Sequence, residues 1–213
     1  MTKVKKSSIL LTCLLLALLC GVLFYIDGNA SKYIIRITRL CAINIVLALS
    51  MNLVNGFTGI FSLGHAGFMA IGAYTVALLT IPVAKKETIF MLEPLVAPLN
   101  TLTLPFGAAL VIGGLLAAAL AFLIGLPCLR LRGDYLAIAT LGFSEIIRIV
   151  ITNAQSLTNG AQGLKSIPAT ANIWWCYGVA LATVVFIALL ISSSYGRAFK
   201  AIREDEIAAE SMG

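Results

Sequence analysis

The residue types that could do chemistry gather between Asn52 and Tyr74. This stretch contains the single histidine, His65, two asparagines and five glycines within a sequence that is otherwise mostly aliphatic. Glycine-broken helices are tolerated at membrane depth only where the freed backbone groups meet protein or water, and such breaks often border a transport path. The stretch therefore indicates either a translocation path or close helix packing, carried by Asn52, Asn55, Gly56, Gly59, Ser62, Gly64, His65 and Gly72.

His65 has three possible roles: a hydrogen-bonded interior residue, a member of a proton relay, or a ligand. The sequence places no second histidine and no acidic residue near it. A zinc site needs at least three protein ligands, so a metal site is not expected. We favour the hydrogen-bonding role.

A second polar feature is the pair Glu145 and Arg148, three residues apart inside an apolar run. Side chains at this spacing meet on one helix face. On insertion scales an unpaired charge at that depth costs about 2.5–3.5 kcal/mol. The pair must therefore face protein or water. A structural ion pair is favoured over a role in the transport path.

The elements that position these residues are membrane-spanning helices. Charged residues make up 11% of the chain and apolar ones 60%, whereas a soluble domain is about a quarter charged. One span takes about 20 residues, so the chain has room for roughly six spans and no separate soluble domain. The five cysteines form no CxxC pair, which argues against a disulfide framework and a metal site. The basic residues flank apolar runs instead of forming a patch, which argues against nucleic-acid binding.

The fold class is therefore all-α: a polytopic membrane protein of about six transmembrane helices, one of them broken by glycines. The first apolar run is longer than that of a typical cleaved signal, which favours an uncleaved first span, although Gly28-Asn29-Ala30 would suit a cleavage site. After the glycines a helix is expected to restart at Ser62. Basic residues predict that the N-terminus and the tail are cytoplasmic. The expected spans are residues 9–26, 33–54, 62–82, 105–126, 135–152 and 173–192, with outer loops at 84–104 and 153–172.

Two helix faces carry further expectations. Arg36 and Arg39 share one face at the outer end of the second span, where they favour interfacial anchoring over contact with a substrate. Small residues share one face of the fourth span and predict close packing there: Gly114, Ala118, Ala121 and Gly125.

The tail, residues 195–213, alternates charged residues with alanine and isoleucine, which is typical of an exposed amphipathic helix. It follows a span directly. A solvated helix end and a docking helix for a soluble partner both fit this pattern.

Several motifs together resemble the permease subunits of branched-chain amino-acid ABC transporters, and the last three of those given below resemble the M-type subunit more than its H-type partner. The first is Asn52-Leu53-Val54-Asn55-Gly56 with Ser62-Leu63-Gly64-His65-Ala66 and Gly72-Ala73-Tyr74. The others are residues 129–135 with Thr140-Leu141 and Glu145-Ile146-Ile147-Arg148, residues 157–164, and Gly196-Arg197-Ala198 with residues 201–209.

The resemblance implies a single permease domain, residues 1–213, in a bacterial inner membrane. It implies a second, H-type permease subunit, two cytoplasmic ATPases and a periplasmic binding protein that delivers leucine, isoleucine or valine. Residues 195–213 correspond to the cytoplasmic coupling segment that meets the ATPase, with Arg197, Arg203, Glu204, Asp205, Glu206, Ala208, Ala209 and Gly213. Asn159 stands where the family has glycine, and the chain stops within the coupling segment, which predicts an N-terminal fragment.

The sequence predicts no catalysis, no cofactor and no metal. No lysine follows a glycine, so the Gly-Lys of a phosphate-binding loop is missing and ATP hydrolysis must come from a partner. Urea, short amides or sugars remain alternative substrates. An ion-coupled secondary transporter is the alternative from another class. Such a transporter would be expected to have carboxylates in several spans, and only Glu145 lies in one. For a membrane-embedded enzyme, the sequence offers no paired carboxylates, no nucleophile with a base and no metal cluster.

Overall fold

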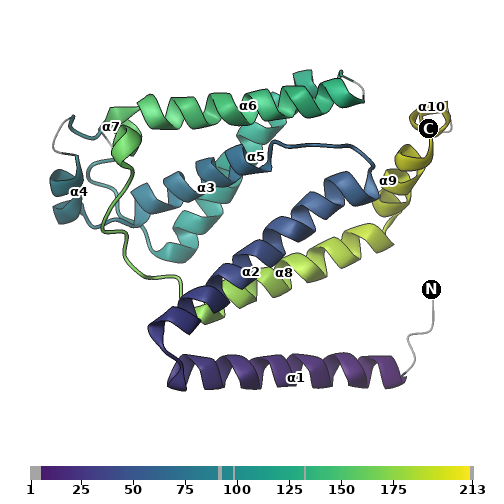
Figure 1. The fold of residues 1–213 in the computed structure, drawn as a ribbon, viewed down its shortest axis with the longest axis horizontal. Helices are drawn as coiled ribbons and strands as arrows, with labels where there is room; N and C mark the ends of the chain where they lie inside the picture. Colours follow the sequence, from purple (N-terminus) through teal and green to yellow (C-terminus); the bar gives the residue numbers. More distant parts are fainter. Residues whose placement is uncertain (1–5, 91–92, 98, 132, 212–213) are drawn as a thin grey trace. The chain divides into compact units, whose positions relative to one another are not determined.

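A computed structural model describes residues 6–90, 93–97, 99–131 and 133–211 (Figure 1). Within these ranges every regular element is a helix, which confirms the all-α prediction. The elements are α1 (Lys6–Asn29), α2 (Lys32–Asn52), the π-helix η1 (Leu53–Phe57), α3 (His65–Thr80), α4 (Val83–Ile89), α5 (Phe106–Cys128), α6 (Asp134–Asn153), α7 (Gln155–Thr158), the 3-10 helix η2 (Gly160–Gln162), α8 (Ile173–Ser192), α9 (Ser194–Glu204) and α10 (Glu206–Ser211).

Helix length and hydropathy identify the candidate spans. In the described residues four helices are long and apolar enough to cross a membrane: Lys32–Phe57, Phe106–Cys128, Asp134–Asn153 and Ile173–Ser192. A fifth is possible if α3 and α4, bent by 119° at Ile81 and Pro82, count as one span. The Cys13–Asn29 part of α1 is a shorter apolar helix. The chain is therefore a polytopic membrane protein, and the expected count of six spans is not confirmed.

The chain forms two compact units, and α2 and α8 each contribute to both. The first unit comprises residues 1–48 and 171–186. Its buried side chains include Ala42 and Ile173, both fully enclosed. The hydroxyl of Tyr177 on α8 donates to the carbonyl of Thr38 on α2, with an oxygen–oxygen distance of 3.3 Å. This hydrogen bond links the two helices.

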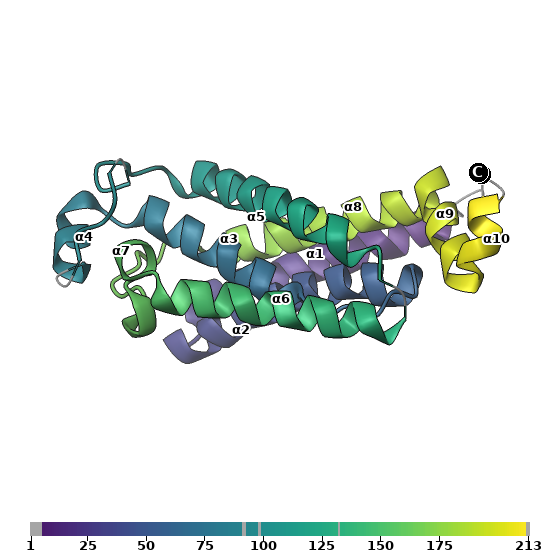
Figure 2. The same ribbon diagram turned by 90° about the horizontal axis from the view of Figure 1, so that it is seen from above.

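The second unit, residues 49–170 and 187–213, is built around α3, which packs against α5 and α6 (Figures 1 and 2). α3 and α5 approach each other closely at Gly113. A Cβ there would lie 2.8 Å from Val76 Cγ2 and 3.2 Å from the Gly72 carbonyl oxygen. Small residues allow membrane helices this close contact. The expected packing face begins one residue later, but a Cβ on Gly114 or Gly125 would meet no atom of another part of the chain within 4 Å.

The connection from α3 to α5 is held by a buried lysine. Lys86 on α4 is 1% exposed, and its ammonium group donates to the carbonyls of Leu99 at 2.7 Å and Leu102 at 2.6 Å. Leu78, Phe90 and Leu95 form an apolar cluster in the same region. An outer loop was expected from residue 84, and the burial of Lys86 beside an exposed Lys85 was not predicted.

The connection from α6 to α8 contains Asn159, which stands where the resembled family has glycine. This residue is left-handed, with φ 60° and ψ 21°, between α7 and η2. Asparagine tolerates this conformation better than most residues because its short side chain can hydrogen-bond locally. Here its Nδ2 donates to the Gly163 carbonyl at 3.0 Å. The turn that glycine would make is therefore made by asparagine.

The approach at Gly113 gives a matched test. We expect Gly113→Ala to lower the thermal unfolding midpoint of the purified protein, because the methyl group must separate α3 from α5; overpacking typically costs about 1–3 kcal/mol. Gly114→Ala is the control, and it should leave the midpoint equal or higher since alanine is the better helix former. Equal effects of both changes would contradict the packing described above.

Candidate translocation path and coupling segment

The break after the second span begins as a widened helix turn. α2 ends at Asn52 and continues as η1. The hydroxyl of Thr58 donates to the carbonyl of Val54, and residues 58–64 then cross to α3 without helical structure. α3 starts at His65, three residues after the expected restart at Ser62. The expectation was wrong at this boundary because the backbone of Ser62 and Leu63 is engaged elsewhere.

Two side chains bond the backbone groups that the break releases. Asn55 Oδ1 accepts from the Ser62 N–H at 3.2 Å, and Thr140 Oγ1, on α6, accepts from the Leu63 N–H at 3.1 Å. A backbone polar group without a partner would be costly in hydrocarbon. The break is therefore bonded on one side by its own asparagine and on the other by α6.

Thr140 is a residue whose role sequence reasoning missed. It belonged to a motif of the resemblance, but nothing in the sequence paired it with Leu63, 77 positions away. A threonine in a span most often bonds its own helix, and the Thr140 hydroxyl also donates to the Ala137 carbonyl at 3.0 Å. Only the tertiary structure shows that its oxygen accepts a second hydrogen bond.

The glycines of the break provide space for close neighbours. A Cβ on Gly56 would collide with the Asn52 carboxamide. Gly59 has φ +71°, and a Cβ there would lie 2.7 Å from Cγ of Arg203 on α9. The Arg203 guanidinium donates from Nη1 to the Gly56 carbonyl at 3.2 Å. The tail thus contacts the break directly, a contact that the sequence did not predict.

The remaining residues of this stretch lie on α3 or at its start. Gly64 is buried against Thr140, and a Cβ on Gly67 would lie 2.9 Å from Ile147 Cδ1 on α6. Gly72 lies opposite Gly113 of α5. These glycines let α3 approach both neighbours, which is a packing arrangement. His65 is half-buried in the first turn of α3, and its hydrogen-bonding role stays a prediction.

Glu145 and Arg148 form the expected ion pair on α6. Arg148 Nη2 lies 2.5 Å from Glu145 Oε1, and Nε lies 3.0 Å from each carboxylate oxygen. The Arg148 side chain is 70% exposed and the Glu145 side chain 50%. No side chain in the described part of this chain covers the pair. At membrane depth such charges must contact either another protein or water.

The tail differs from the expected single amphipathic helix. Asp205 is extended, with φ −160° and ψ 114°, and separates α9 from α10. Its Oδ1 accepts from the N–H groups of Ile207 at 2.9 Å and Ala208 at 3.1 Å. The prediction of one continuous helix was wrong because the Asp205 carboxylate caps a new helix, as aspartate does at helix starts.

The predicted coupling residues are distributed over both tail helices. Arg197, Arg203 and Glu204 are exposed on α9, and Arg203 also pairs with Glu204 at 2.9 Å. On α10, Ala208 is exposed and Ala209 half-buried. Glu206 begins α10, and Gly213 lies outside the described residues. α9 and α10 pack against each other, so the segment is a compact pair of short helices.

Across the described ranges no three His, Cys, Asp or Glu side chains lie close enough together to hold a metal ion.

The Thr140 contact predicts a selective loss of stability. Thr140→Val removes the acceptor of the Leu63 N–H, and a backbone N–H at membrane depth has no alternative partner in hydrocarbon, so the thermal unfolding midpoint should fall. Thr140→Ser should restore it. Thr183→Val is the control, because the Thr183 hydroxyl donates only within its own helix, to Val179. A fall of the same size in the control would refute the role assigned to Thr140.

Comparison with known proteins identifies the family. Residues 33–213 match the family described as branched-chain amino acid transport system / permease component. The chain is 38% identical over 217 aligned residues to the high-affinity branched-chain amino acid transport system permease protein LivM of Escherichia coli (strain K12), and 37% identical over 217 to the protein of that name from Salmonella typhimurium. Both alignments cover 86% of this chain and 47% of the relative.

A more distant relative is the probable branched-chain amino acid transport permease protein LivM of Methanocaldococcus jannaschii, 23% identical over 201 residues, with 79% of this chain and 56% of the relative aligned. The chain thus spans about half the length of the curated relatives it matches. No solved structure gives a significant match. Because the family match covers most of the sequence, the chain belongs to the branched-chain amino acid transport system permease family.

Proposed function

We propose that the complete protein is the membrane-spanning permease subunit of an ATP-driven importer of leucine, isoleucine and valine. The family match and the names of the relatives support this assignment. A periplasmic binding protein would deliver the amino acid, a second, H-type permease would complete the path, and two cytoplasmic ATPases would supply energy. The absence of a Gly-Lys pair from the sequence supports a separate source of ATP hydrolysis.

The break at residues 52–64 is proposed to border the translocation path. Its polar and glycine residues interrupt a candidate span, and α3, which follows it, packs against both α5 and α6. A shift of the break would therefore move α3 or strain its contacts. Glu145 and Arg148 have an uncovered polar face on α6, which fits a contact with the second permease or with water in the path.

The contact between Arg203 and the break is the observation that carries the coupling role. Arg203 bonds the Gly56 carbonyl and packs on Gly59, while α10 follows one residue after α9. We propose that residues 195–213 dock on the ATPase and that Arg203 transmits their movement to the break. Residues 1–213 would then form one permease domain of which the tail is the coupling segment.

The proposed orientation places the N-terminus and the tail in the cytoplasm of a bacterial inner membrane. Basic residues favour the cytoplasmic side, and they occur near the N-terminus, before α6 and in α9. The tail must be cytoplasmic if it meets an ATPase. The orientation and the coupling role are therefore linked.

Uptake by the complete protein with its partners tests the substrate and the energy source. We expect isoleucine and valine, but not urea or sugars, to compete with labelled leucine, and we expect uptake to continue when an uncoupler collapses the ion gradient while ATP is maintained. Competition by urea or a sugar would overturn the substrate assignment. If uptake stopped when the ion gradient was collapsed and ATP was maintained, the protein would be a secondary transporter.

Docking of the tail has its own test. Ile207 is 69% exposed on α10, and Ile207→Glu in the complete protein should reduce co-purification of the ATPase at least several-fold, because a charge replaces an apolar contact. Val83→Glu changes another exposed apolar residue, on α4, and should leave co-purification unchanged. Full retention of the ATPase by the Ile207 variant would exclude α10 as the docking element.

A further inference from the structure

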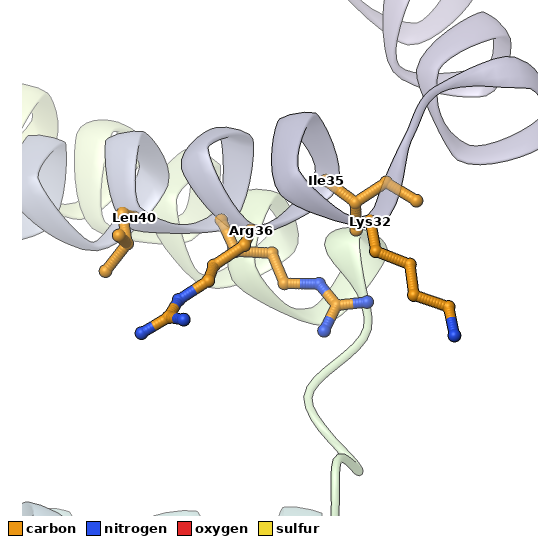
Figure 3. Close-up of a pocket in the computed structure, with 5 residues that line it drawn as sticks. Lys32, Ile35, Arg36 and Leu40 are labelled. Carbon is orange, nitrogen blue, oxygen red and sulfur yellow. The ribbon is translucent and has the colours of Figure 1, made fainter.

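Three cations line a groove on α2. Lys32, Arg36 and Arg39 follow one another at spacings of four and three residues, which places them on one helix face. Together with Ile35 and Leu40 they line a groove of ≈ 430 Å³. Figure 3 shows the Lys32 and Arg36 side chains extending to the same side of the helix. Positive charge and apolar surface therefore meet in one concave site.

Nothing in the described part of the chain neutralises this charge. The ion pairs found there join Arg148 to Glu145 and Arg203 to Glu204, and the sequence of α2 contains no Asp or Glu. Arg39 Nε is shielded from solvent and has no hydrogen-bond partner among the described residues. Like charges one turn apart repel. The groove thus combines uncompensated positive charge with an enclosed, unused donor.

The location of the groove indicates what kind of anion it would meet. α2 with η1 is a candidate span that begins at Lys32, so the cations occupy its first two turns, where long basic side chains reach the level of the lipid headgroups. Ile35 and Leu40 provide an apolar wall beside them. A guanidinium fork matches the oxygens of a phosphate, and anionic headgroups bind basic pockets on membrane helices.

We propose that this groove binds the phosphate of an anionic phospholipid, held by Arg36 and Arg39 with Lys32 at the rim. The guanidinium groups of Arg36 and Arg39 would donate to phosphate oxygens, and an acyl chain would lie along Ile35 and Leu40. A soluble phosphate ester offers the same oxygens, but it lacks an acyl chain for the apolar wall. The site is independent of the transport role proposed above.

The test uses the complete protein in phosphatidylcholine nanodiscs with and without phosphatidylglycerol. Native mass spectrometry measures retained lipid, and thermal unfolding measures the stabilisation that the lipid gives. We expect phosphatidylglycerol to be retained and to raise the unfolding midpoint. Arg36→Gln with Arg39→Gln should weaken its binding on the order of thirtyfold, since each cation near an anionic surface contributes about fivefold. Lys85→Gln with Lys165→Gln, two exposed cations elsewhere, is the control and should bind normally.

Three outcomes would overturn the site: retention of phosphatidylcholine to the same extent, an unchanged affinity in the double arginine variant, or the same stabilisation by soluble glycerol phosphate. If the variant does not fold, spin-labelled lipids are compared on the unaltered protein. A larger motionally restricted fraction for phosphatidylglycerol than for phosphatidylcholine, abolished by excess unlabelled phosphatidylglycerol, supports the site. Equal fractions reject it.

Discussion

Backbone N–H and C=O groups in a hydrocarbon environment must find hydrogen-bond partners inside the protein, and the break between α2 and α3 depends on this constraint. Asn55 bonds the Ser62 N–H, Thr140 bonds the Leu63 N–H and Arg203 bonds the Gly56 carbonyl. The three partners come from the break itself, from α6 and from the tail. An interruption that would otherwise weaken a span therefore connects three parts of the second unit.

Close packing makes that connection mechanically useful. α3 follows the break directly and meets α6 at Gly67 and α5 at Gly113, where even a methyl group would contact neighbouring atoms within 3 Å. Packed interfaces of this density do not deform continuously. A displacement of Arg203 would therefore shift the break and move α3 as a rigid body. This is the physical basis for the coupling role proposed for the tail.

Sequence reasoning was most successful where one helix contains the whole pattern. The bounds of α5 and α6 agree with the expected spans to within two residues, and the Glu145–Arg148 pair follows from helix geometry alone. Sequence reasoning was least successful where two adjacent residues of the same type have different surroundings in the fold. Gly113 and Gly114 are equivalent in sequence, as are Lys85 and Lys86, yet only Gly113 touches α3 and only Lys86 is buried.

The sequence by itself determined the membrane class, the helical fold, the location of the break and the family, because apolar run length and local motifs depend on residues close together in the chain. The tertiary structure decided which oxygen bonds the Leu63 N–H, where α3 begins, that Arg203 reaches Gly56, and that Asp205 divides the tail. The first three depend on distances between residues far apart in sequence. The last reflects a local competition, in which the carboxylate of Asp205 bonds the backbone of α10 in place of a continued helix.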